Sequence, residues 1–137
     1  MVGAVAMSGE VIHFEVPADN TERARKFYSS TFGWKLQHMP EFDYTMVMTG
    51  EHGEDGMPKE PGYIGGGLAK RGGMVSNVVI TIGVDDIEKH LKTIEKNGGK
   101  TLQKKQPIGD GTMGFTAYFK DTEGNVIGLW QMGKPPA

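Results

Sequence analysis

Apolar and polar residues alternate with a period of two close to the N-terminus of the chain. Ile12, Phe14 and Val16 alternate there with His13 and Glu15. This alternation is typical of a β-strand with two different faces. We therefore predict a strand in which the three apolar side chains point toward a core and in which His13 and Glu15 share the opposite face.

The residues after this strand carry signals for the start and the end of a helix. Pro17 predicts the end of the strand, because proline has no backbone N–H to donate. Asp19 or Asn20 is suited to cap a helix, and Glu22 follows Asp19 at the spacing of a capping box. Gly33 predicts the end of the helix, because glycine readily adopts the left-handed C-cap conformation.

The same series recurs 66 residues later without a gap. Residues 79–102 repeat the pattern of residues 13–36, with 85–88 in the place of 19–22 and Gly99 in the place of Gly33. The strand alternation is repeated by Ile80, Ile82 and Val84. A constant offset over 24 positions indicates two copies of one supersecondary unit.

The remaining alternations predict three further strands in each copy. These strands are expected at residues 34–38, 42–49, 63–70, 100–103, 115–120 and 125–132. Each copy is then strand, helix and three strands, which predicts a single α+β domain, residues 1–137, with modules at about 9–70 and 76–133. The run Gly65 to Gly67 lacks side chains, so we expect another group to approach this strand closely.

Composition excludes several classes of function. Fifteen Lys and Arg against 17 Asp and Glu give a net charge of −2 without a basic cluster, so neither nucleic acid nor an anionic membrane surface is an expected partner. No apolar run approaches the roughly 20 residues of a membrane span, and residues 1–7 do not resemble a signal peptide. Zero cysteines exclude disulfides and thiolate chemistry. We expect a cytoplasmic protein.

Four stretches resemble the vicinal oxygen chelate superfamily, which includes glyoxalase I, bleomycin resistance proteins, extradiol dioxygenases and methylmalonyl-CoA epimerases. They read HFEVPADNTERARKFYSSTFGW, IGGGLAKR, ITIGVDDIEKHLKTIEKNGG and YFKDTEGNVIGLWQ. The resemblance implies two tandem βαβββ modules whose curved mixed sheet forms a cup with the helices outside. Members of this superfamily commonly dimerise, so a homodimer is expected.

The enzymes of this superfamily hold a divalent metal through the first and last strands of each module. The resemblance places these ligand positions at His13, Val79, Gly128 and Gly67, or at Gly65 if the register shifts by two. Only His13 can bind a metal, whereas a Zn²⁺, Ni²⁺ or Fe²⁺ site needs three or four N or O donors. We therefore expect no cofactor and no conventional metal site, with His13 as a ligand only in a non-standard set around one divalent ion.

His13 and Glu15 leave three interpretations open. They are a hydrogen-bonded structural pair, a ligand-orienting or catalytic pair in which His13 acts as general acid or base, or the remnant of a metal site. His38, His52 and His90 are expected on the solvated surface.

Aromatic and Met side chains on the strand faces are interpreted either as core or as the lining of a ligand pocket. Tyr118 and Phe119 lie on opposite faces of one strand, so only one of them is expected to join a pocket. Glycine at the ligand positions is expected to leave space for an organic molecule. The candidate ligand-binding residues are Tyr44, Met46, Met48, Gly67, Val79, Tyr118, Phe119, Gly128 and Trp130.

Three functional hypotheses follow. The first is a protein that binds a small, largely apolar organic molecule without a conventional metal site. The alternative is a metal-dependent enzyme that uses His13 in a non-standard ligand set. Such an enzyme would be a lyase or isomerase similar to lactoylglutathione lyase, or a dioxygenase. The third is an interaction module with a vestigial cavity. The sequence leaves open whether the protein is an enzyme.

Overall fold

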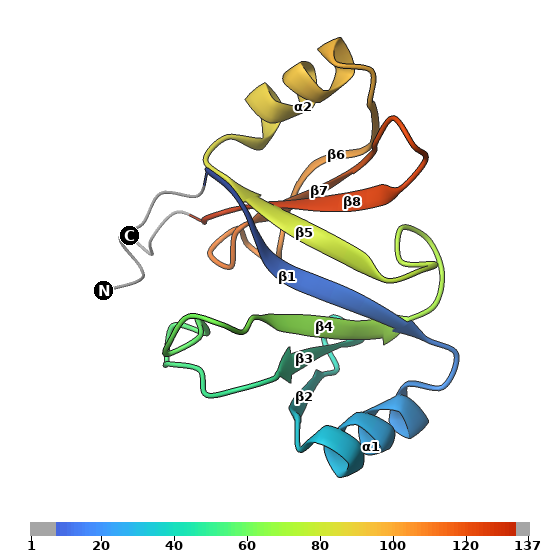
Figure 1. The fold of residues 1–137 in the computed structure, drawn as a ribbon, viewed down its shortest axis with the longest axis vertical. Helices are drawn as coiled ribbons and strands as arrows, with labels where there is room; N and C mark the ends of the chain where they lie inside the picture. Colours follow the sequence, from blue (N-terminus) through green and yellow to red (C-terminus); the bar gives the residue numbers. More distant parts are fainter. Residues whose placement is uncertain (1–7, 134–137) are drawn as a thin grey trace. The chain divides into compact units, whose positions relative to one another are not determined.

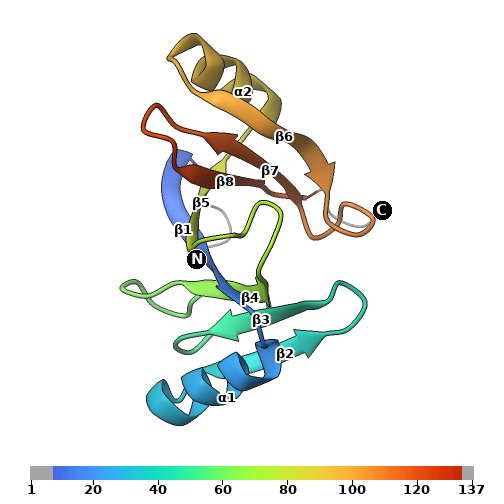
Figure 2. The same ribbon diagram turned by 90° about the vertical axis from the view of Figure 1, so that its right-hand side faces the viewer.

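The computed structural model describes residues 8–133. The fold is α+β and consists of two successive βαβββ modules, as the sequence predicted (Figures 1 and 2). The first module contains β1 (Ser8–Ala18), α1 (Thr21–Phe32), β2 (Lys35–Met39), β3 (Tyr44–Met48) and β4 (Gly65–Lys70). The second contains β5 (Val79–Val84), α2 (Ile87–Lys96), β6 (Lys100–Pro107), β7 (Phe115–Lys120) and β8 (Val126–Gln131).

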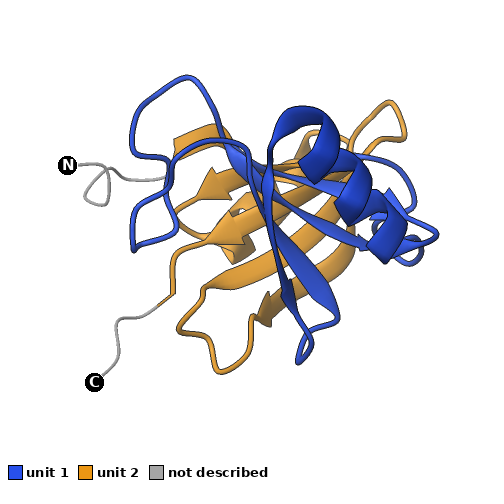
Figure 3. Cartoon of the chain, turned by 90° about the horizontal axis from the view of Figure 1, so that it is seen from below, with its two compact units in different colours: residues 1–5, 12–79 blue, residues 6–11, 80–137 orange. Residues whose placement is uncertain are grey.

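The described chain divides into two compact units, residues 12–79 and residues 8–11 with 80–133 (Figure 3). In the first unit the strands lie in the order β2-β3-β4-β1, and in the second in the order β5-β8-β7-β6. The first strand of each module is parallel to the last strand of the same module, and the other pairs are antiparallel. The two halves therefore share one connectivity, as expected of a repeated unit.

Helix α1 begins and ends at capping residues that the sequence marked. The side chain of Asn20 accepts a hydrogen bond of 2.9 Å from the backbone N–H of Arg23. Gly33 closes the helix at φ 72°, in the left-handed region. Of the two possible caps, Asn20 is the one used, because Asp19 instead pairs with Arg71 at 2.9 Å. The capping box between Asp19 and Glu22 is therefore not the start of this helix.

Strand β1 extends further than the sequence indicated. Pro17 pairs with Ala69 and Ala18 with Lys70 in the parallel ladder with β4, so the prediction that Pro17 stops the strand is wrong. Only alternate residues of a strand direct their N–H groups to the same neighbour, and Pro17 is the last residue but one. The missing donor therefore does not end the pairing.

Helix α2 also ends differently from its counterpart. Its N-cap is Asp86, whose side chain accepts from Lys89 at 3.1 Å. Its C-cap is Asn97, and the left-handed residue is Gly98 at φ 99° rather than the predicted Gly99.

Within residues 8–133, neither helix has the length and apolar character required to cross a bilayer.

Each unit has its core between its own helix and one face of its own strands. In the first unit Ala18, Val47 and Leu68 are buried, and the rings of Tyr28 and Trp34 stack beside them with centroids 4.8 Å apart. The core of the second unit consists of Val84, Ile87, Leu91, Ala117, Phe119 and Leu129. The opposite face of the strands in each unit carries the candidate site residues other than Phe119.

Candidate functional site

The register of the first unit places His13 and Glu15 on the face that points away from α1. His13 is the partner of Gly65 in the ladder between β1 and β4, and Glu15 is the partner of Gly67. Met46 pairs with Gly67 from the other side. Partnered residues of neighbouring strands point to the same face, so this face carries two polar side chains, a Met side chain and a glycine floor.

The hydroxyl of Tyr44 connects His13 with Glu15 on this face. It donates a hydrogen bond of 2.9 Å to Oε2 of Glu15 and lies 3.0 Å from Nε2 of His13. A hydroxyl has one proton to donate, so Tyr44 accepts from a protonated Nε2 of His13. In neutral His13 the lone pair therefore resides on Nδ1. The sequence analysis interpreted Tyr44 as core or as pocket lining and missed this connection.

Burial affects the charge of His13. Removal of the imidazole from water lowers the pKa of His13 below its ordinary value of 6.5, and the negative charge of Glu15 opposes this shift only in part. Glu15 itself is buried, with 7% of its surface exposed. His13 is therefore neutral at pH 7 and is available as a hydrogen-bond acceptor or a proton acceptor through Nδ1.

This lowered pKa of His13 predicts a pH-dependent stability. As the pH falls through about 6.5, His13 takes up its proton in the unfolded chain at a higher pH than in the folded chain. The free energy of unfolding should therefore be highest above this pH, where His13 is neutral in both states. It should decrease as the pH is lowered through this value. Urea unfolding between about pH 7.5 and 5.5 should show a smaller decrease for His13→Gln than for the wild-type protein. The control His90→Gln retains His13 and should keep the decrease, whereas an unchanged slope in His13→Gln contradicts the prediction.

The three glycines of β4 are each covered by a side chain from elsewhere in the first unit. A Cβ atom at Gly65 would lie 2.8 Å from Nε2 of His52, and one at Gly66 would lie 2.6 Å from the ring of Phe14. A Cβ atom at Gly67 would overlap the hydroxyl of Tyr44. The expected close approach to this strand is confirmed. The expectation that Gly67 leaves open space is wrong, because the end of Tyr44 fills it.

The second unit presents a comparable face on β5, β7 and β8. Gly128 is the partner of both Thr81 and Tyr118, and a Cβ atom at residue 128 would lie 2.8 Å from the hydroxyl of Thr81. The indole N–H of Trp130 donates to the carbonyl of Met113 at 3.2 Å. Gly128, Tyr118 and Trp130 thus share the face opposite α2.

Two of the predicted ligand-binding residues of the second module are buried in the structure. Val79, at the start of β5, is 1% exposed. Phe119 lies in the core with Ile87 and Leu91, so its side chain is on the face of β7 that packs against α2. Its inclusion among the ligand-binding residues is wrong, and Tyr118 is the member of that pair on the face of Gly128, because adjacent strand residues point to opposite sides.

The residues at the metal-ligand positions do not fit a divalent ion. Glu15 pairs with Gly67 as Thr81 pairs with Gly128, so the register selects Gly67 over Gly65 as the counterpart of Gly128. His13 is the one donor among the four positions, and its Nε2 is engaged by Tyr44. Within residues 8–133, no three His, Cys, Asp or Glu side chains are grouped to hold a metal.

His52 departs from its expected place on the solvated surface. It lies in the segment between β3 and β4, where its Nδ1 donates to the carbonyl of Gly50 at 2.8 Å. Its Nε2 is buried and has no hydrogen-bond partner in the described part of the chain. Sequence reasoning missed this residue because no local spacing links a loop histidine to a strand glycine 13 positions later.

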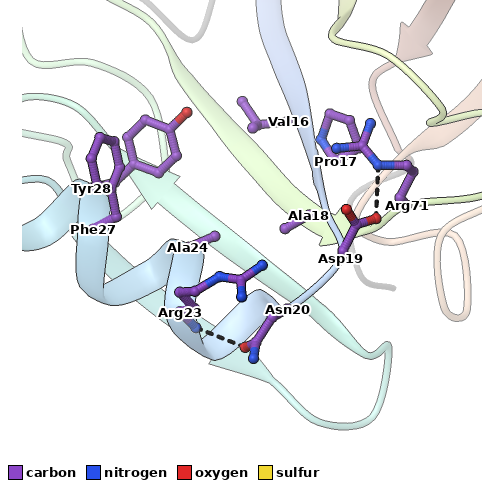
Figure 4. Close-up of a pocket in the computed structure, with 10 residues that line it drawn as sticks. All are labelled: Val16, Pro17, Ala18, Asp19, Asn20, Arg23, Ala24, Phe27, Tyr28 and Arg71. Atoms are coloured by element: carbon purple, nitrogen blue, oxygen red, sulfur yellow. Dashed lines mark hydrogen bonds and ion pairs between the residues drawn. The ribbon is translucent and has the colours of Figure 1, made fainter.

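A shallow pocket of about 340 Å³ lies elsewhere in the first unit, between α1, the C-terminal end of β1 and Arg71, which follows β4 (Figure 4). Its walls include the ring of Phe27 and the ion pair of Arg71 with Asp19. The lining residues are Val16, Pro17, Ala18, Asp19, Asn20, Arg23, Ala24, Phe27, Tyr28 and Arg71. None of the predicted site residues lines it, so we place the candidate site on the opposite face, at the hydrogen bonds of Tyr44.

The fold is that of a known class of proteins. Residues 10–129 match the profile of the Glyoxalase/Bleomycin resistance protein/Dioxygenase superfamily, and the chain belongs to this superfamily. A glyoxylase-like domain-containing protein of Didymella fabae is 33% identical over 126 residues, which cover 89% of this chain and 93% of the relative.

Solved structures of two enzymes share the fold. A methylmalonyl-CoA epimerase of Streptomyces coelicolor has a TM-score of 0.63 at 15% identity, with 96% of this chain and 99% of that chain covered. The 2,3-dioxygenase LapB of Pseudomonas sp. KL28 has a TM-score of 0.61 at 13% identity, with 93% of this chain and 44% of that chain covered. At these identities the likeness concerns the fold alone, since one scaffold in this superfamily serves different chemistries.

Proposed function

We propose that this protein binds a small, largely apolar organic molecule on the strand face opposite α1, without a conventional metal site. The hydrogen bond that Tyr44 donates to Glu15 and the one that it accepts from His13 carry this proposal. They fix a polar anchor on a face that also carries the side chains of Met46 and Met48. A flexible thioether surface with a few fixed polar groups is typical of a small-molecule site.

Each residue of the anchor has a distinct role in the proposed binding. Tyr44 holds His13 in the tautomer that carries its proton on Nε2, so that Nδ1 offers a lone pair. Glu15 accepts a hydrogen bond from the hydroxyl of Tyr44 and thereby sets the direction of this chain of hydrogen bonds. Met46 and Met48 supply apolar contact area. The anchor orients the molecule while the Met side chains contribute affinity.

The second candidate function is a metal-dependent lyase, isomerase or dioxygenase with a non-standard ligand set. One observation favours it: the lowered pKa of His13 keeps the imidazole neutral, as a metal ligand or a general base must be. Against it stands the donor set, which has Val79, Gly67 and Gly128 at the other positions. We therefore give this candidate the second place.

Binding of neutral aromatic compounds tests the proposed function. We expect 2-methoxynaphthalene or a related bicyclic compound to raise the Tm of the wild-type protein, because a ligand that binds only the folded state stabilises it by about 2.7 kcal/mol at a hundredfold excess over Kd. Met46→Ser should weaken the binding. The matched control Met113→Ser changes an exposed Met side chain of the second unit and should bind as the wild type does.

The competing enzyme hypothesis predicts a different result in the same preparation. Elemental analysis of protein purified without a chelator would then find one divalent metal per chain, and His13→Ala would lose it. That outcome, or equal binding by Met46→Ser and the wild-type protein, contradicts the proposed function.

A further inference from the structure

The imidazole of His52 presents an unsatisfied acceptor inside the first unit. Its Nδ1 bears the ring proton in the neutral state, because this nitrogen donates to the carbonyl of Gly50 at 2.8 Å. The lone pair therefore resides on Nε2, which is buried and has no partner among residues 8–133. Most buried polar atoms in proteins are hydrogen-bonded, so an acceptor left without a donor requires an explanation.

The position of this nitrogen relates it to the candidate site. A Cβ atom at Gly65 would lie 2.8 Å from Nε2 of His52, so the ring covers the face of Gly65 from which a side chain would project. Gly65 is the ladder partner of His13, and partners in adjacent strands lie about 4.8 Å apart and share a face. His52 thus lies over the same strand face as the hydrogen bonds of Tyr44.

Several contacts fix the ring of His52 in this place. The segment that carries it folds back on itself, with Gly53 N–H donating to the carbonyl of Met57 at 2.8 Å and Lys59 N–H to that of Glu51 at 3.0 Å. The ring of Tyr63 packs edge-on against His52 at 5.9 Å. The unpaired nitrogen is therefore held by a built local structure, and it is not the result of a freely rotating surface side chain.

We propose that Nε2 of His52 is a second polar anchor, which accepts a hydrogen bond from a hydroxyl or N–H group of the bound molecule. The inference rests on the proposed function and specifies its ligand as an apolar molecule that carries a hydrogen-bond donor. In the free protein Nε2 has no donor, and a molecule without one would leave this nitrogen unpaired. Because Nε2 is buried in the free protein, the proposed hydrogen bond requires that the segment around His52 yields slightly outward when the molecule binds beside Gly65. The site therefore selects molecules by the presence of a hydrogen-bond donor and not by their size alone.

Two fluorescent probes of matched shape test this inference. 2-Naphthol carries a hydroxyl donor and is neutral at pH 7, and 2-methoxynaphthalene has the same ring system without the donor. We expect the wild-type protein to bind 2-naphthol about tenfold more tightly, the contribution of roughly one hydrogen bond. In His52→Phe the two probes should bind about equally, because the acceptor is lost while a ring of similar size remains.

A second variant moves the same acceptor without removing it. Gly65→Ala places a Cβ atom against Nε2 of His52 and pushes the ring away, so this variant should also lose the preference. The control His90→Phe changes a histidine of α2 and should retain it. Equal binding of both probes by the wild-type protein, or a preference that survives in both variants, overturns the role of His52 and leaves the proposed function standing. Failure of the wild-type protein to bind either probe overturns both.

The tautomer of His52 gives a test that requires no variant. Long-range ¹⁵N–¹H correlation spectra of the wild-type protein should show the ring proton of His52 on Nδ1 and that of His13 on Nε2. Addition of 2-naphthol should shift the Nε2 signal of His52, and addition of 2-methoxynaphthalene should not. A proton found on Nε2 of His52 in the free protein overturns the inference.

Discussion

Replacement of Gly67 by alanine is expected to destabilise the protein by about 4 kcal/mol. The new Cβ atom would occupy the place of the Tyr44 hydroxyl, so the ring must leave its position. This cost combines about 1–3 kcal/mol of overpacking with about 1–3 kcal/mol for the loss of the hydrogen bonds to Glu15 and His13. Urea unfolding should measure the loss, with a Tm lower by roughly 15 °C.

A double-mutant cycle assigns this cost to the contact between the two residues. In a Tyr44→Ala background, Gly67→Ala should cost little, because the side chain that it displaces is absent. Gly53→Ala is the matched control, since its new Cβ atom would meet the exposed carboxylate of Asp55 at 3.0 Å and would approach the carbonyl of Met57 no closer than 3.9 Å. Independent, additive effects of the two substitutions would show that Tyr44 does not fill the space over Gly67.

Tyr44→Phe is expected to cost about 2–3 kcal/mol of stability and to abolish the orientation of His13. The substitution keeps the ring and removes only the hydroxyl. Glu15, which is buried, loses one of its hydrogen-bond donors, and Nε2 of His13 loses its acceptor. A hydrogen bond to a charged group contributes about 1.5–3 kcal/mol. Chemical denaturation measures this loss, and imidazole ¹⁵N spectra should show that His13 no longer favours one tautomer.

Tyr63→Phe provides the control for this prediction. Tyr63 is in the same unit, and its hydroxyl donates to the backbone carbonyl of Glu51 at the exposed surface. Water can replace such a bond, so the loss should be about 1 kcal/mol or less. Equal losses in Tyr44→Phe and Tyr63→Phe would mean that the bridge between Glu15 and His13 has no special role in stability.

The two predicted losses mean that the residues of the candidate site also stabilise the fold. Total stabilities of domains are about 5–15 kcal/mol, so a change of 4 kcal/mol at Gly67 is a large share. Glycine at this position is therefore coupled to the packing of the site, because it admits the Tyr44 hydroxyl that donates to Glu15.

The order of the elements and the faces of the strands were accessible from the sequence because they depend on short-range patterns. The 66-residue offset predicted both βαβββ modules, and the period of two placed His13 and Glu15 on one face and Phe14 on the other. Gly33 marked the end of α1 through its backbone freedom. Local signals were less reliable where two neighbouring residues could both cap the helix, as at Asp19 and Asn20. They were also less reliable at Pro17, where the pairing of β1 with β4 decides whether the strand ends.

The contents of the candidate site were decided by pairing between distant segments. Tyr44 and Glu15 are 29 positions apart, and His52 and Gly65 are 13 apart, so no periodicity of one element reports their contact. The register of the strand ladders identifies Gly67 as the counterpart of Gly128. Packing against α2 places Phe119 in the core of the second unit. Alternation along a strand is a property of the local backbone, whereas the neighbour that fills the space over a glycine depends on how the strands and loops fold together. The sequence by itself therefore determined the modules and the polar face, and only the tertiary structure decided that a tyrosine joins the two polar groups and that a loop histidine lies beside them.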